Sequence, residues 1–350
     1  MFATFTTWLN KVFADKESVT LTAILLGIAA IIAFAGAVLQ PVFISLVLAY
    51  FLFWLADTLY QEGVPYNLAV GLVYIVFLGA FLASILVLFP LVWQQFGLMF
   101  EELPNMMFKA QQALYMIPER FPDYLSRADV DAFTVDVVRS LRAAGREVLS
   151  ASIASIPSII AILVYTVLVP LMVFFFLKDK KRITAWLSRF LPKERRLLTH
   201  VWTEVDNQLG NYIRGKVVEM IIVFLATYAG FLVFGLKYGM LLAFLVGVSV
   251  LVPYVGAIIV TIPVVAVALF QWGLSPETFW LLFTYTVIQA IDGNLLVPIL
   301  FSEAVSIHPV VIIIAIIFFG GLWGAWGVFF AIPLAILFRA VIESWPTAKS

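Results

Sequence analysis

The sequence is dominated by long stretches without a single charged side chain. Five such runs, each bounded by acidic or basic residues, are 30 to 39 residues long. A helix needs about 20 mostly apolar residues to cross the hydrocarbon core of a bilayer, so the longest runs have room for two helices and a turn. The runs lie between Glu17 and Asp57, Glu62 and Glu101, Glu147 and Lys178, Lys237 and Glu277, and Glu303 and Arg339.

The composition excludes several classes of protein. Hydrophobic residues make up 63% of the chain and charged residues 12%, whereas a soluble domain is about 45–50% apolar and about 25% charged, so a water-soluble enzyme is excluded. The 21 basic and 21 acidic residues balance, which argues against nucleic acid as a partner because phosphate binding needs a basic surplus. With no cysteine and two histidines, we expect no metal site and no cofactor.

Apolar patterning predicts an all-α polytopic membrane protein with about six spanning helices. Because proline lacks a backbone donor and restricts the residue before it, we expect a turn at Gln40–Pro41 between the first two helices. The N-terminal stretch lacks a small-residue cleavage site and a second span follows at once, so a cleavable signal peptide is not expected. The six helices are predicted at about residues 19–39, 42–57, 66–90, 153–177, 217–235 and 278–298.

Two polar segments interrupt the spans and predict the orientation. Residues 179–216 are rich in lysine and arginine, and the positive-inside rule places them in the cytoplasm with both termini. Within 193–214, apolar residues recur every three or four positions, which predicts an amphipathic helix that either lies on the membrane or couples to the next span. The expected parts are N-terminal helices (1–90), an extracytoplasmic helical segment (91–150), one helix (151–178), the basic cytoplasmic segment (179–216) and a transport core (217–345).

Proline and glycine break two apolar stretches in the last third of the chain. Residues 238–271 are interrupted around Pro253, Tyr254 and Gly256, and residues 307–343 around a glycine cluster. The arm before each break has about 14–15 residues, or roughly 21–22 Å of helix, which is shorter than the roughly 30 Å hydrocarbon core. We therefore expect re-entrant hairpins whose tips line a protein cavity, because irregular backbone is tolerated there. The glycines of the second tip are Gly320, Gly321 and Gly324.

The order of these segments predicts an inverted repeat. One span (217–235) precedes the first hairpin and another (278–298) precedes the second, so the two units start from opposite membrane faces. Such repeats place substrate near the membrane midplane. We expect hinges at Pro263, Pro298 and Pro333, the first and last of which lie 70 residues apart. Two ordinary kinked helix pairs are the alternative, because glycine and proline are common in membrane helices.

A polar cluster in this apolar region is the main predicted site. Gln289, Asp292 and Asn294 lie within one and a half turns of helix. A charge within a span is costly and points to function, so Asp292 predicts a site linked to a proton or cation. The alternatives are that Asp292 caps a broken helix, or that it pairs with Lys237 or Arg339.

Six motifs follow one another in order through residues 211–340, and together they resemble the autoinducer-2 exporter family. Within that family the chain is most similar to the PerM-like permeases, and the three early helices, external segment and basic segment match the family's layout. The motifs are Asn211-Tyr212-Ile213-Arg214-Gly215-Lys216, Val252-Pro253-Tyr254-Val255-Gly256-Ala257, Asp292-Gly293-Asn294-Leu295-Leu296-Val297-Pro298, His308-Pro309, Gly320-Gly321 with Gly324 and Gly327, and Ala331-Ile332-Pro333.

The resemblance implies a transporter of the bacterial inner membrane without ATP hydrolysis of its own, and the chain indeed lacks a Gly-x4-Gly-Lys-Ser/Thr loop. Family members are linked to export of the small polar signal autoinducer-2 or to sodium–proton exchange. The resemblance also implies a homo-oligomer, with a pentamer suggested, and hairpins that move. Many relatives lack an acid at the position of Asp292, so coupling there would belong to the PerM-like branch.

Three functional hypotheses remain open at the level of sequence. The first is a secondary transporter, a permease or exporter, that moves a small polar solute, cation or proton by alternating access, with hairpin tips closing over a midplane site. The second is a membrane scaffold or assembly factor that does not transport and acts through residues 91–150. The third is a passive channel. The residue pattern does not name the solute, the direction of transport or the coupling ion.

Overall fold

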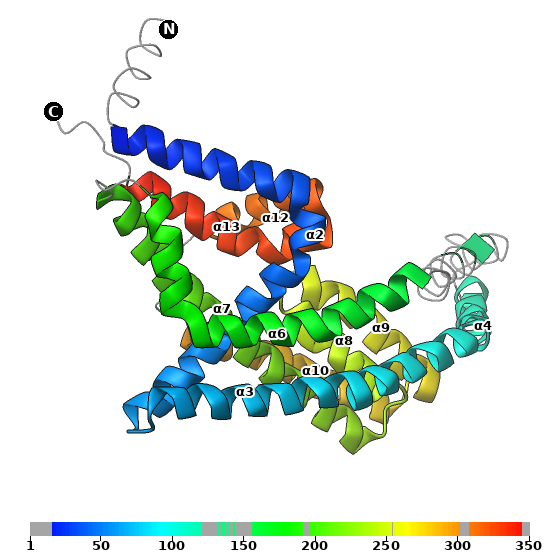
Figure 1. Cartoon of the computed structure of the whole chain (residues 1–350). Helices are drawn as coiled ribbons and strands as arrows, with labels where there is room; N and C mark the ends of the chain where they lie inside the picture. The colour runs from blue at the N-terminus through cyan, green and yellow to red at the C-terminus, as the bar shows by residue number, and fades with distance from the viewer. Residues whose placement is uncertain are drawn as a thin grey trace, which may run out of the picture. The chain divides into compact units, whose positions relative to one another are not determined.

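The structure is a computed structural model, and the residues it describes are almost entirely helical (Figure 1). Among them there is no β-strand, as the sequence predicted. Five stretches are long and apolar enough to cross a membrane, namely Val38–Gln61, Tyr66–Met106, Arg196–Phe234, Val255–Trp272 and Pro276–Phe301. The described residues are 16–120, Ala132, Val135, Asp136, Arg139, Ala143, 156–191, 196–253, 255–301 and 308–344.

Four of the six predicted spans fall within these five stretches to within one residue: 42–57, 66–90, 217–235 and 278–298. The predicted spans 19–39 and 153–177 lie in helices where the structure describes them, but they are not among the five. The remaining stretch, Val255–Trp272, is the second arm of the first predicted hairpin. That arm is 18 residues long, or about 27 Å of helix, and is therefore longer than a short re-entrant arm.

Helix α2 (Lys16–Gln61) is a single helix of 46 residues, so the predicted turn at Gln40–Pro41 is wrong. Pro41 lies inside the helix, and the ribbon changes direction part-way along (Figure 1). The Ser45 hydroxyl donates to the Pro41 carbonyl at 2.5 Å. A proline bends a helix without necessarily ending it, and a serine that donates to the carbonyl four residues earlier often adds to the bend.

A second unbroken run joins α3 (Tyr66–Ala83), the π-helical turn η1 (Ser84–Leu88) and α4 (Phe89–Arg120). The helix passes straight through the predicted boundary between the span ending at residue 90 and the external segment starting at 91, so that boundary is not a helix end. The first part of the predicted helical segment 91–150 is therefore part of α4. The rest of that segment lies mostly outside the described residues.

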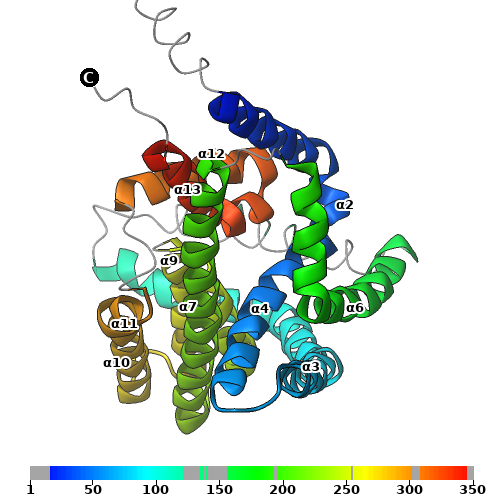
Figure 2. The same cartoon turned by 60° about the vertical axis from the view of Figure 1, so that its left-hand side comes forward.

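The basic segment contains the end of α6 (Ile156–Leu187) and the beginning of α7 (Arg196–Phe234), with a short 3-10 turn η2 (Ser188–Phe190) after α6. The backbone of α6 kinks at Asp179, whose φ is −104° and ψ 18°, two residues after the predicted end of the span at 177. Figure 2 shows α7 as one helix. The amphipathic stretch and the following span are therefore continuous, which favours coupling over a separate surface helix.

Both predicted helical hairpins are present. The first hairpin consists of α8 (Gly239–Ser249) and α9 (Val255–Trp272), and the second of α12 (Pro309–Trp323) and α13 (Ala325–Ser344). Between them lie α10 (Pro276–Ile291), the π-helical turn η3 (Asp292–Leu296) and α11 (Val297–Phe301). The structure thus has a break at each predicted tip.

The chain forms two compact units, each assembled from segments that are distant in the sequence. The first unit comprises residues 1–78, 165–218 and 296–350, and includes the second hairpin. Its core contains Tyr212, Ile213, Ile332 and Ile336. The second unit comprises residues 79–164 and 219–295, and includes the first hairpin. Its most deeply buried side chains include Phe231, Leu242, Val246, Val264 and Leu281.

Candidate functional site

The tip of the first hairpin is a close crossing of backbone. A Cβ on Gly256, the second residue of α9, would lie 1.9 Å from the carbonyl oxygen of Ser249. Only glycine allows that approach. Pro253 lies in the turn, where its carbonyl oxygen accepts a hydrogen bond from the Val255 N–H at 2.7 Å. Tyr254, the other predicted tip residue, lies outside the described residues.

The tip of the second hairpin uses glycine in the same way. A Cβ on Gly327 would lie 1.8 Å from the Phe319 carbonyl oxygen, and one on Gly320 would lie 2.8 Å from the Val328 side chain. Gly324 has φ +60°, a conformation that L residues rarely adopt. Gly321 differs, because a Cβ there would meet nothing within 4 Å. Three of these glycines are therefore needed for the turn itself, and Gly321 is not.

Several landmarks of the two hairpins recur at a separation of 70, although the crowded tip glycines, Gly256 and Gly327, are 71 apart. Their first helices begin at Gly239 and Pro309, and their second helices at Val255 and Ala325. The carbonyl groups that crowd the tip glycines belong to Ser249 and Phe319, which are also 70 apart. Pro263 and Pro333 continue the match inside the second helix of each hairpin. This agreement supports the predicted internal repeat.

A line of hydrogen bonds joins α9 and α10 inside the second unit. The Gln289 amide donates to the Tyr285 hydroxyl at 2.8 Å, and the Tyr285 and Thr261 hydroxyls are 3.0 Å apart. Because Thr261 already donates its only proton to the Ala257 carbonyl at 2.7 Å, Tyr285 must be the donor to Thr261. The line therefore runs in one direction, from Gln289 through Tyr285 and Thr261 to Ala257, and Tyr285 is only 3% exposed.

Asp292 follows Gln289 on the same side of the helix and begins the π-helical turn η3. Its Oδ1 is buried, and its own N–H donates to the carbonyls of Gln289 and Ile288. The backbone of Asp292 is helical, with φ −57° and ψ −59°, so the helix is not broken at this residue. A π-turn inside a helix frequently accompanies a functional site.

The other predicted residues near Asp292 have separate environments. Asn294 is exposed and donates to the Ala290 carbonyl at 2.9 Å, so it bonds to its own helix and does not join the line. The two basic residues considered as partners of Asp292 contact other acids: Lys237 contacts Glu102 at 3.3 Å, and Arg339 contacts Glu343 at 2.7 Å. Pro298 is exposed in α11, in the first unit.

Several buried polar residues were missed by the sequence reasoning. Thr261 and Tyr285 were not singled out, because hydroxyl side chains are common in membrane helices and their partners depend on tertiary packing. Thr227 of α7 is fully buried and was missed for the same reason. Glu219 was interpreted from the sequence as an ion-pair partner at the cytoplasmic boundary, and it is only 2% exposed. Among the described residues, no group of three or more His, Asp or Glu side chains is placed to hold a metal ion.

The motif Asn211–Lys216 has a packing role in the first unit. A Cβ on Gly215 would lie 2.6 Å from the ring of Phe301, and the buried Lys216 ammonium lies 5.1 Å from the same ring's centroid. Arg214 lies over the Trp54 ring at 5.6 Å. The motif thus joins α7 to α11 and α2. Similarly, His308 caps α12 by accepting the Val310 N–H at 3.2 Å.

Comparison with known proteins agrees with these motifs. The family described as AI-2E family transporter matches residues 21–347. The chain belongs to this family. "Putative permease PerM" of Escherichia coli strain K12 is 47% identical over 343 residues, which cover 98% of this chain and 97% of that protein. "Putative transport protein YrrI" of Bacillus subtilis is 25% identical over 86% of this chain and 85% of that protein.

Membership in this family makes the protein a multi-pass membrane protein of a transporter family, and not an enzyme. The bilayer is therefore one of its partners. "Putative transport protein YueF" of Bacillus subtilis, 25% identical over 88% of this chain and 84% of that protein, is a further relative with a similar name. The resemblance to PerM-like permeases seen in the sequence motifs is confirmed.

Proposed function

We propose that the protein is a secondary transporter of the bacterial inner membrane that moves a small polar solute or ion by alternating access. The observation that carries this proposal is the hydrogen-bond line from Gln289 to Ala257, together with Asp292 one turn further along. Polar groups between apolar helices are costly unless they are satisfied, and inside membranes they commonly mark substrate or ion pathways. Here they connect the second helix of the first hairpin to α10.

The line suggests how the first hairpin acts as a gate. The Thr261 and Tyr285 hydroxyls form a polar contact between α9 and α10, so movement of the hairpin exchanges this contact for contacts with solute or water. Asp292 supplies a carboxylate that binds a cation or a proton. Backbone groups of Pro253, Gly256, Gly320 and Gly324 are hydrogen-bonded within the tips, so they become available to solute only when a tip moves. The further proposed contacts are Tyr254, Gly321 and Asn294, and the proposed hinges are Pro263, Pro298 and Pro333.

The contact of Glu102 with Lys237 agrees with the number of spans predicted between these residues. Two predicted spans, 153–177 and 217–235, separate Glu102 from Lys237, so both residues should lie at the same membrane face. Two charges that each end an apolar run can meet only if they share a face. The proposed topology has both termini in the cytoplasm, which requires the parts of α2 before and after Pro41 to cross the membrane separately. The proposed assembly is a homo-oligomer, with a pentamer as the first number to test by light scattering.

The decisive experiment measures flux in proteoliposomes that contain purified protein. Candidate small polar solutes are supplied with a proton or sodium gradient, and Asp292→Asn is compared with Glu277→Gln, which removes a negative charge from the exposed start of the same helix. We expect saturable flux that falls about tenfold or more in Asp292→Asn, as for loss of a buried charged contact, and that is unchanged in Glu277→Gln.

The same assay separates the alternatives. Equal flux in Asp292→Asn and the native protein at several pH values would show that no coupling takes place at Asp292. Flux that neither saturates nor depends on a counter-ion would indicate a passive channel. No flux for any solute, together with capture of an external partner that is lost when residues 91–150 are deleted, would indicate the scaffold.

A further inference from the structure

The base of the first hairpin is held by α4, far in sequence from the hairpin itself. The Glu102 carboxylate contacts the Lys237 ammonium at 3.3 Å through Oε1, and its Oε2 accepts a hydrogen bond from the Tyr238 hydroxyl. Gln95, seven residues earlier on the same face of α4, accepts the Leu241 N–H at 2.9 Å. One face of α4 therefore contacts both the loop before α8 and the first turn of α8.

The backbone of this loop has an unusual conformation that the contacts with α4 help to explain. Tyr238 has φ +57° and ψ 22°, the only positive φ outside glycine among the described residues. Such a conformation is costly for a residue with a Cβ and persists where its surroundings hold it. The Tyr238 hydroxyl reaches Glu102 and lies 3.5 Å from the Leu98 carbonyl of α4. Helix α4 therefore holds the strained residue.

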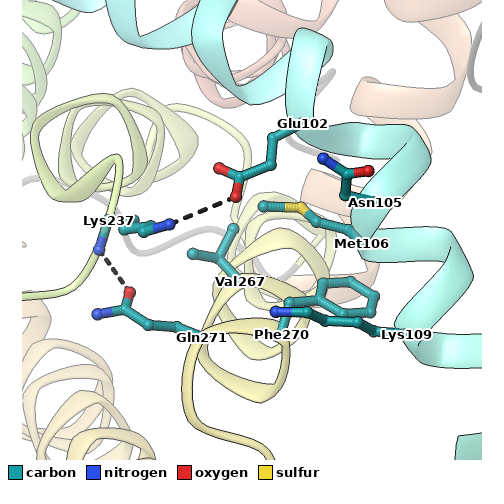
Figure 3. Close-up of a pocket in the computed structure, with 8 residues that line it drawn as sticks. All are labelled: Glu102, Asn105, Met106, Lys109, Lys237, Val267, Phe270 and Gln271. Carbon is teal, nitrogen blue, oxygen red and sulfur yellow. Dashed lines mark hydrogen bonds and ion pairs between the residues drawn. The ribbon is translucent and has the colours of Figure 1, made fainter.

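The second helix of the hairpin is joined to the same loop. The Gln271 side chain makes two bonds to this loop: its Oε1 accepts the Lys237 N–H at 2.7 Å, and its Nε2 donates to the Gly235 carbonyl at 2.9 Å. Figure 3 shows Gln271 of α9 and Glu102 of α4 on either side of Lys237. Both arms of the hairpin and the loop are thus connected at one point, and α4 contacts them there.

A small cavity of about 80 Å³ opens beside the ion pair, with Asn105, Met106 and Lys109 of α4 on one side and Val267 and Phe270 of α9 on the other (Figure 3). The Lys237 and Glu102 side chains are 55% and 35% exposed. Water and salt can therefore reach the pair, and dissolved ions weaken an exposed pair by screening. The Glu102–Lys237 ion pair therefore forms in this structure but remains exposed to water and salt, which can break it.

We propose that Glu102 and Gln95 of α4 are positioning residues that latch the base of the first hairpin, and that the hairpin moves when this latch opens. The latch is defined by Gln95, Glu102, Lys237, Tyr238 and Gln271. That these residues hold the base of the hairpin is inferred from the contacts described above. That their release lets the hairpin move during transport rests on the proposed function. Through the latch, α4, which leads into the predicted external segment, would control the movement of the first hairpin.

The structural part is tested by hydrogen–deuterium exchange on the full-length protein in detergent or nanodiscs. The Lys237 and Leu241 amides donate to side chains of the latch, so their exchange reports its opening directly. We expect Glu102→Gln to speed exchange across residues 235–242 roughly three- to tenfold, the scale of losing one exposed charged contact. Glu101→Gln is the matched control, because Glu101 is exposed and adjacent on α4.

A charge swap separates a specific latch from general damage to the fold. The double variant Glu102→Lys with Lys237→Glu keeps an ion pair at the same place but removes the acceptor of the Tyr238 hydroxyl. We therefore expect it to restore part of the slow exchange that either single change loses. Raising the salt concentration from about 0.05 M to 1 M should speed exchange in the native protein and have little effect on Glu102→Gln. Equal exchange in Glu102→Gln and Glu101→Gln, or no rescue by the swap, would overturn the latch.

Flux measurements on the same variants test the gating part. If the latch restrains the hairpin, Glu102→Gln changes the maximal rate several-fold while the solute concentration for half-maximal flux stays the same, and the charge swap reverses part of that change. Unchanged rates beside faster exchange would overturn the gating role and leave transport standing. If the native protein shows no flux, the proposed function fails, and the exchange data still support or overturn the latch.

Discussion

The Tyr285 hydroxyl takes part in two of the hydrogen bonds of the line between α9 and α10. It accepts from Gln289 and donates to Thr261 while the ring lies 6.1 Å from that of Phe231. A phenol that is 3% exposed and bonded on both sides is a fixed polar point between two apolar helices. The contact across α9 and α10 therefore depends on one oxygen atom.

Tyr285→Phe removes this oxygen and keeps the ring. Because Gln289 loses an acceptor and Thr261 loses a donor, we expect the free energy of unfolding in detergent to fall by about 1–2 kcal/mol and the flux to fall with it. Tyr228→Phe is the control, since Tyr228 lies on α7 with its ring stacked on Phe224 at 6.1 Å. Equal losses in both variants would show that the hydroxyl line has no special role.

Tyr238 gives a prediction for high pH. Burial and the neighbouring Glu102 carboxylate raise the pKa of Tyr238 from 10.0 to about 12. A pKa raised in the folded state means that this residue's contribution is full below about pH 10 and is lost as the pH rises towards 12. We expect the melting temperature of the native protein to fall more steeply between pH 10 and 12 than that of Tyr238→Phe. Parallel curves would contradict the hydrogen bond to Glu102.

At the scale of residues, charge was predictable from the sequence and hydroxyl partners were not. Asp292 was singled out because a carboxylate in an apolar span is rare and costly, and the structure places it at a π-helical turn. Thr261 carried no comparable signal, because a threonine can bond its own helix anywhere in a membrane, as it does here with Ala257. Its contact with Tyr285 depends on how two helices pack.

At the scale of elements, the glycines at the two hairpin tips make a matched pair. Gly256→Ala and Gly327→Ala each place a Cβ within 2 Å of a carbonyl oxygen, so the tip backbone must move. We expect each change to destabilise the protein by roughly 3 kcal/mol or more, measured by thermal unfolding in detergent. Gly321→Ala should have little effect, because its surroundings are open. A tolerated Gly256→Ala would show that the tip differs from this crossing.

Helix boundaries were the least predictable feature of these elements. The sequence predicted a break at Pro41, but that residue lies inside α2. At Pro253 and in the glycine cluster at 320–327 the prediction of a break was correct. The difference is physical: Pro41 is a single proline within a long apolar run and bends the helix without ending it, whereas the hairpin tips combine proline or a positive φ with glycines that allow backbone contact. A single proline in an apolar run is weak evidence for a helix break, whereas a cluster of prolines or glycines is strong evidence for one.

At the scale of the whole molecule, the surface agrees with a lipid environment. Phe34, Val233 and Ile317 are 93%, 82% and 70% exposed, and exposed apolar area of this kind is unfavourable in water but not in a bilayer. The sequence predicted this class from its uncharged runs alone. The contacts between charges that end different runs, such as Glu102 with Lys237, could not be predicted, because they depend on the packing of helices distant in the sequence.

The orientation of the chain gives the last prediction. The protein has no cysteine, so single cysteines at Ser126, Ser188 and Leu274 can be labelled without interference. A hairpin returns the chain to the face it left, which puts the loop at Leu274, itself 98% exposed, on the same side as the predicted external segment.

We therefore expect a membrane-impermeant maleimide to label positions 126 and 274 in intact cells, and position 188 only after permeabilisation, because the basic segment is retained in the cytoplasm. Labelling of position 188 in intact cells would reverse the orientation. Labelling of 126 without 274 would mean that the first hairpin does not return to its starting face. In that case the two hairpins would not start from opposite faces, and the proposed inverted repeat would be wrong.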